Sequence, residues 1–102
     1  NNLTKPPMKR IDFSRLEVET SIGVFETADL RSTLGNLIFR SATTLELDTL
    51  ARKVFSAQEG RFAEFSDDEY AAMMQSFKAA GVLFPVICAI ERQVESTPIE
   101  TE

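Results

Sequence analysis

The apolar residues of this chain change their spacing once, near residue 28. Before that point they alternate with polar residues, as where Ile11 and Phe13 flank Asp12. Period two is typical of a strand with one buried face. After that point they recur every three or four positions, which is typical of helices that face a core. A chain with strands first and helices afterwards is expected to form an α+β fold.

A turn inside the alternating segment makes it a hairpin. Ser21, Ile22 and Gly23 interrupt the pattern, and β-prone residues resume at Val24. Glycine allows a tight reversal of the chain at little steric cost. We therefore predict a β-hairpin that turns near Gly23, and a short third strand over residues 61–65. An isolated hairpin is only marginally stable, so its apolar face is expected to pack against helices.

The first two predicted helices have polar starts and apolar stripes. Asp29 favours the positive end of a helix dipole, so the first helix is expected to begin near it. Gly35 lowers helix propensity there, which predicts either a closely approaching partner backbone or an irregular helix. Thr43 and Glu46 have capping-box spacing for the second helix. Its predicted buried stripe consists of Leu47, Leu50, Ala51, Val54 and Phe55.

The last two predicted helices have clearer ends. Ser66 and Glu69 form a second capping box. Gly81 is expected to cap the third helix in a left-handed conformation, and Pro85 suits the first turn of the fourth. The expected order is ββαα(β)αα, with about four helices packed against the hairpin. The predicted buried stripes are Tyr70, Met73, Met74 and Phe77 in the third helix, and Val86, Ile87, Ile90 and Val94 in the fourth.

The length of the chain limits the number of domains. Its 102 residues give room for one hydrophobic core. We predict a single α+β domain over residues 8–96, a tail over residues 1–7 and a frayed acidic C-terminus over residues 97–102. No apolar run reaches the roughly 20 residues that a membrane-spanning helix needs.

Residue types that usually carry catalysis are scarce. The chain has no histidine, and its four glycines are dispersed, so the commonest general base and a phosphate-binding loop are both missing. The single cysteine, Cys88, is expected to be a buried core residue in a reducing compartment. We predict a cytoplasmic, non-enzymatic protein without a cofactor or a metal. An enzyme based on two facing carboxylates is the remaining catalytic alternative.

The charge of the chain is acidic and unevenly distributed. A net charge of −5 disfavours direct binding to nucleic acid or to an anionic membrane. The N-terminal end is basic and the C-terminal end acidic, which could attract neighbouring copies. Helix capping explains the densest acids better than a metal site does. The alternative function is a regulator or inhibitor of a nucleic-acid enzyme that acts as a phosphate mimic. Its predicted acidic surface consists of Asp67, Asp68, Glu69, Glu91 and Glu95.

The chain has more phenylalanines than its buried stripes use. Of the eight, Phe25, Phe39, Phe62 and Phe84 lie outside the stripes. Exposed together, they would form an apolar patch typical of a protein interface. The leading prediction is therefore a protein-binding or assembly accessory protein, whose partner, or second copy, contacts the hairpin edge or the region of Phe39. The helix pair joined near Gly81 superficially resembles a helix-turn-helix but lacks base-contacting side chains.

Several short motifs resemble small uncharacterised proteins encoded by prophages. They are Ile11-Asp12-Phe13-Ser14, the alternating strand that follows, Asp29-Leu30-Arg31, Leu34-Gly35-Asn36 and Ile38-Phe39. The similarity extends from Met8 to about Ile90 as an order of elements. Because that family has no established activity, the resemblance implies a phage setting and supplies no site residue.

Overall fold

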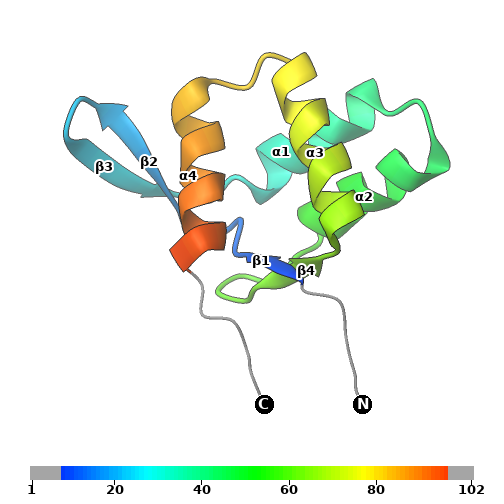
Figure 1. Cartoon of the computed structure of the whole chain (residues 1–102), viewed down its shortest axis with the longest axis horizontal. Coiled ribbons are helices and arrows are strands. Elements are labelled where there is room, and N and C mark those ends of the chain that lie inside the picture. The colour runs from blue at the N-terminus through cyan, green and yellow to red at the C-terminus, as the bar shows by residue number, and fades with distance from the viewer. Residues whose placement is uncertain (1–7, 97–102) are drawn as a thin grey trace.

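The computed structural model describes residues 8–96, which form four strands and four helices. The predicted tails, residues 1–7 and 97–102, lie outside the described residues. One short strand precedes the hairpin, and from there the order matches the predicted α+β fold: a hairpin, two helices, a short strand and two helices (Figure 1). The elements are β1 (Lys9–Ile11), β2 (Leu16–Ser21), β3 (Val24–Ala28), α1 (Arg31–Ser41), α2 (Leu45–Phe55), β4 (Ala63–Phe65), α3 (Asp67–Ala79) and α4 (Phe84–Ser96).

The described strands form two separate antiparallel pairs, β1 with β4 and β2 with β3. The alternating pattern alone does not show the break between β1 and β2. There the carboxylate of Asp12 accepts hydrogen bonds from the backbone N–H and the hydroxyl of Ser14, and this local turn competes with strand pairing. The predicted hairpin turn is confirmed, with Gly23 at φ 79°. The predicted third strand is also confirmed, as β4.

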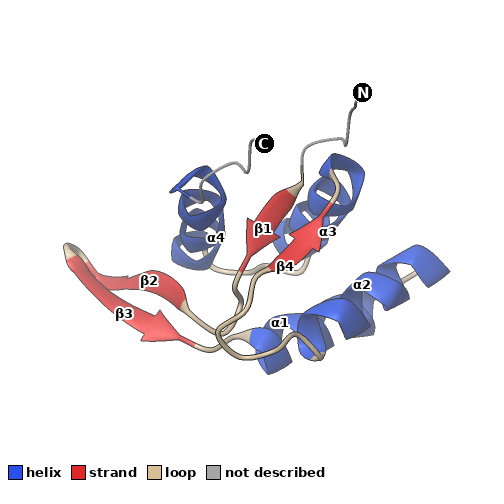
Figure 2. Ribbon diagram, turned by 90° about the horizontal axis from the view of Figure 1, so that it is seen from below, coloured by secondary structure: helices blue, strands red, loops and turns tan. Residues whose placement is uncertain are grey.

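The two strand pairs lie in different parts of the molecule. Figure 2 shows the β2–β3 hairpin extending to one side and the α1–α2 pair to the other, with β1 and β4 between them. α3 and α4 stand side by side, and α4 also packs against β2 (Figure 1). None of the helices within residues 8–96 is both long and apolar enough to cross a membrane.

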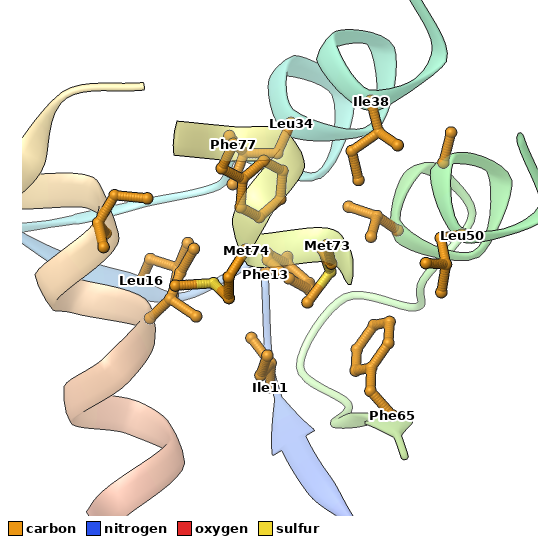
Figure 3. Packing of buried hydrophobic residues seen from close by; sticks show 14 of the residues in the cluster. Ile11, Phe13, Leu16, Leu34, Ile38, Leu50, Phe65, Met73, Met74 and Phe77 are labelled. Atoms are coloured by element: carbon orange, nitrogen blue, oxygen red, sulfur yellow. The ribbon is translucent and has the colours of Figure 1, made fainter. Parts of the chain in front are cut away.

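The hydrophobic core lies against one face of α3. Met73, Met74 and Phe77 project from that helix toward residues of the other helices and of the strands (Figure 3). The rings of Phe13 and Phe65 meet edge to face, with centroids 6.0 Å apart. The fully or almost fully buried apolar residues are Ile11, Phe13, Leu16, Leu34, Ile38, Leu50, Ala51, Val54, Phe65, Met73, Met74, Phe77, Ile87, Ala89 and Ile90.

Two of the predicted helix ends are confirmed in detail. The Ser66 hydroxyl accepts the N–H of Glu69 at 3.1 Å, and the Glu69 carboxylate accepts the N–H of Ser66 at 2.8 Å, so the capping box is complete. Gly81 has φ 83°, and the N–H of Val82 donates to the carbonyl of Phe77 at 3.0 Å. α3 is therefore closed at both ends by the residues that the sequence indicates.

Two other predictions about helices are wrong. The N-cap of α2 is Thr44, one residue after the predicted Thr43, because the Thr44 hydroxyl accepts the N–H of Leu47 at 3.1 Å. Cys88 is only partly buried. Its neighbours Ile87 and Ile90 take the core-facing positions of α4, which leaves Cys88 on the flank of the helix.

Candidate functional site

The four phenylalanines predicted to lie outside the core are all exposed. The exposed fractions are 48% for Phe25, 51% for Phe39, 44% for Phe62 and 73% for Phe84. They come from β3, α1, the segment before β4 and the start of α4, and β3 and α1 lie on different sides of the molecule (Figure 2). The structure therefore exposes these rings without gathering all four into one patch.

Three of these rings lie beneath an arginine. The guanidinium of Arg92 is 5.0 Å from the ring centroid of Phe25, and that of Arg52 is 5.5 Å from Phe39. The guanidinium of Arg10 is 5.4 Å from the ring of Phe62. These are cation–π distances, so each ring has one face covered by a charged group that water also solvates.

Phe39 belongs to a groove between α1 and α2. The groove has a volume of about 350 Å³. A second phenylalanine, Phe55 at the end of α2, is 52% exposed and lies on the same groove. The groove therefore combines two half-exposed aromatic rings. Its lining residues are Gly35, Asn36, Phe39, Ala51, Arg52, Phe55 and Ser56.

Gly35 explains the shape of this groove. A Cβ atom at Gly35 would lie 2.8 Å from the Cβ and 2.9 Å from the backbone nitrogen of Phe55. The first of the two alternatives for Gly35, close approach of another backbone, is therefore correct. With its backbone held against α1, Phe55 projects to the surface, and its predicted place in the buried stripe is wrong. In the sequence, Gly35 is the residue that indicates the close approach of α1 and α2 at this groove.

A fixed charge lies beside the two rings. The Nε of Arg52 donates to the carboxylate of Asp48 at 2.9 Å, and this hydrogen bond raises the pKa of Arg52 above its usual value. The hydroxyl of Ser56 donates to the carbonyl of Arg52 at 2.7 Å. The groove can therefore offer a bound segment apolar contact area and the remaining N–H groups of an arginine that is paired with Asp48.

A second hollow of about 560 Å³ lies between the hairpin and α4. Two of its polar side chains already form hydrogen bonds inside the protein. Arg92 donates to the carbonyl of Glu17 at 2.8 Å, and Gln93 donates to the carbonyl of Arg15 at 3.2 Å. The Gln93 amide oxygen also accepts the N–H of Asp12. These bonds fasten the hairpin and the preceding turn to α4.

The acids at the start of α3 are mostly partnered within the protein. Asp67 lies 3.4 Å from the ammonium of Lys9, and Glu69, besides capping the helix, lies 3.6 Å from that of Lys53. Asp68 is exposed. Two of the three acids in this cluster thus have an internal cation beside them.

The remaining acids of the predicted acidic surface belong to α4. Glu91 and Glu95 lie close enough to Tyr70 on α3 to affect its ionisation. Partial burial, and then the charges of these two carboxylates, raise the pKa of Tyr70 above its usual value. The structure therefore brings the acidic side of α4 toward the first turns of α3.

The buried polar residues have structural roles. Asp12 and Ser14 are bonded to each other, and the Ser14 hydroxyl accepts the N–H of Gly60 at 2.9 Å. These bonds join the turn after β1 to the loop before β4. Within residues 8–96 there is no group of three or more carboxylate or thiol side chains placed to hold a metal ion.

The α1–α2 groove brings two exposed large apolar side chains, Phe39 and Phe55, to one hollow. Aromatic side chains with a nearby arginine are the composition typical of interface centres. In comparisons with family models, curated proteins and solved structures, nothing matches this chain. The candidate site therefore depends on the geometry of this chain alone.

Proposed function

We propose that this protein is a non-enzymatic accessory or assembly factor that binds another protein through the α1–α2 groove. The supporting observation is the pair of half-exposed rings, Phe39 and Phe55, on either side of a preformed hollow. Preformed apolar pockets supply much of the binding energy at interfaces, because little ordering entropy is lost when an anchor enters.

The occupant that best fits this groove is an amphipathic helix with one acidic residue near its apolar face. A third helix can lie along a groove between two packed helices and insert an anchor side chain. Arg52 would keep its bond to Asp48 through Nε and offer its other guanidinium N–H groups to the carboxylate of the partner at the rim of the groove. A neutral or basic partner helix would lack this contact.

The proposed setting is a phage-encoded protein that acts in the cytoplasm. The support for the phage setting is the resemblance of residues 11–14, the strand that follows, and residues 29–31, 34–36 and 38–39 to prophage proteins. The support for the cytoplasm is the cysteine content: with one cysteine, the chain has no internal disulfide to keep oxidised.

The acidic alternative, a phosphate mimic that inhibits a nucleic-acid enzyme, has less support from the geometry. Asp67 and Glu69 already face Lys9 and Lys53, which reduces the negative potential at that end of α3. The two hypotheses differ in the effect of salt. Binding through the groove should tolerate salt, whereas binding by phosphate mimicry should weaken strongly as ionic strength rises.

Site-specific photo-crosslinking tests the proposal. A photoreactive phenylalanine analogue at position 39 of the full chain should crosslink one discrete protein in host or phage lysate, and Phe55→Ser should abolish that product. The analogue at position 84, which is at least as exposed, is the matched control and should not give it. A monomeric protein in light scattering that yields no product at position 39, or the same products at both positions, would contradict the proposal.

A further inference from the structure

The outer edge of β3 has no neighbouring strand among the described residues. β2 lies against α4, where Arg92 holds the carbonyl of Glu17, and β3 lies on the far side of the hairpin (Figure 1). Residues 24–27 are all exposed. An edge of this kind presents backbone N–H and C=O groups that can pair with a strand from another molecule.

The two faces of β3 differ in chemistry. Phe25 is opposite Glu19 in the hairpin, and Glu26 is opposite Val18. Because successive side chains of a strand point to opposite faces, Phe25 lies on one face and Glu26 on the other. A strand added beside β3 would therefore meet an aromatic ring on one face and a carboxylate on the other.

The hairpin itself carries only acidic charges, and one basic side chain of α4, that of Arg92, lies over the ring of Phe25. Residues 16–30 include Glu17, Glu19, Glu26 and Asp29, and contain no lysine or arginine. Asp29 is paired with Arg31 at 2.7 Å, while the ion pairs found among residues 8–96 do not include the three glutamates. The three glutamates of the hairpin thus outnumber the one arginine beside it, Arg92.

We propose that β3 binds an extended basic segment of a partner protein, which adds to the hairpin as a third strand. Alternate side chains of that segment are apolar and contact the part of the Phe25 ring that Arg92 leaves exposed. The others are lysine or arginine, and one of them faces Glu26. This surface is separate from the α1–α2 groove, so the two can be tested independently.

A second copy of the chain is the less favourable occupant of this edge. In a symmetric antiparallel pair, residues opposite each other share a face, so Glu26 would meet Val24, Glu26 or Ala28 of the other copy. None of these offers a positive charge. Each register also brings together two hairpins that each contain four acids and no base between residues 16 and 30.

The test uses a fluorescent peptide of alternating valine and lysine with the full chain. We expect saturable binding in fluorescence anisotropy, slower hydrogen exchange of the amides in residues 24–28, and weaker binding at high salt. The same peptide with every backbone amide N-methylated keeps its charge and side chains but cannot donate to the edge, and should not bind.

Charge variants identify the contact. Glu26→Lys should weaken peptide binding about fivefold, since it turns an attractive cross-strand pair into a repulsive one. Glu59→Lys makes the same change in net charge in an exposed loop, and should have little effect. Circular dichroism checks that both variants fold.

Three outcomes would overturn the proposal. They are equal binding of the N-methylated peptide, binding without protection of residues 24–28, and protection of these residues by a dimer of the chain alone in light scattering. Phe55→Ser should leave peptide binding unchanged, so failure at β3 and failure at the groove are distinguishable.

Discussion

Gly35 is the residue that most affects the candidate site. The sequence shows that this glycine is out of place in a helix, and that observation left two alternatives open. What the sequence could not show is that the approaching backbone is that of Phe55. The periodicity of α2 places Phe55 on the buried stripe, because it measures the direction of a side chain around its own helix and not the distance to the next one.

Gly35→Ala should lower the free energy of unfolding by about 1–2 kcal/mol, although alanine is intrinsically the better helix former. The added methyl group would meet the backbone nitrogen and Cβ of Phe55, which cannot move unless α1 and α2 separate. Urea unfolding measures the change. Thr33→Ala, at an exposed position of the same helix, is the control and should change stability by less than about 0.5 kcal/mol. A more stable Gly35→Ala variant would show that the helices do not approach this closely.

Asp29 should make a pH-dependent contribution to stability. The side chain of Arg31, and then its backbone N–H, hold the pKa of Asp29 below its usual value of 3.8. A carboxyl group whose pKa is lower in the folded state stabilises the fold above the unfolded pKa, and this contribution is lost as pH falls through the folded pKa. Asp29→Asn should therefore be less stable than the wild type at neutral pH, and the difference should shrink as pH falls below 3.8 and through the lower pKa of the folded state. Equal stability at neutral pH would contradict this.

At the scale of elements, helix ends were more predictable than strand partners. The capping box of α3 is confirmed because its signal is contained in four consecutive residues. The predicted N-cap of α2 is wrong by one residue, because Thr43 and Thr44 are adjacent and have the same hydroxyl group. The backbone conformation shows that Thr44 is the cap. The alternation before β2 was interrupted by the local turn of Asp12 and Ser14, whose side-chain bonds a hydrophobic pattern does not reveal.

Ser66→Ala should cost about 1 kcal/mol of stability, because the N–H of Glu69 loses its acceptor at the start of α3. Ser66→Asp is the matched control, since aspartate is an equally good N-cap residue and should keep most of the stability. The denaturant midpoints of the wild type and of the two variants measure these changes in stability. Similar losses in both variants would mean that the hydroxyl is not acting as the cap.

At the scale of the whole molecule, the sequence predicted the class and order of the fold and the pairing of β2 with β3, but not the pairing of β1 with β4. β1 and β4 are far apart in the sequence, and period two identifies the buried face of a strand without naming its partner. The groove also depends on two helices whose packing is a tertiary property. The prediction that four phenylalanines lie outside the core is correct, because these four belong to none of the buried stripes that the spacing of apolar residues defines.

The contact between Phe13 and Phe65 joins the turn after β1 to the end of β4 across the core. Phe13→Leu and Phe65→Leu should each destabilise the protein, and the double variant should lose less than the sum of the two by about 0.5–1.5 kcal/mol. A double-mutant cycle in urea measures this coupling energy. Strict additivity would show that the rings do not interact beyond the apolar area that each one buries.

The bonds of Gln93 also determine the order in which a growing chain can fold. Gln93 is 81 positions after Asp12, whose N–H it accepts, so the turn between β1 and β2 cannot acquire this bond until α4 has left the ribosome. The hydrogen bond between Arg92 and the carbonyl of Glu17, which joins the hairpin to α4, likewise cannot form before α4 has emerged. During synthesis β1 and β2 therefore emerge before the helix that they contact, α4. Leu16, which is buried in the finished fold, stays accessible to chaperones until α4 has emerged.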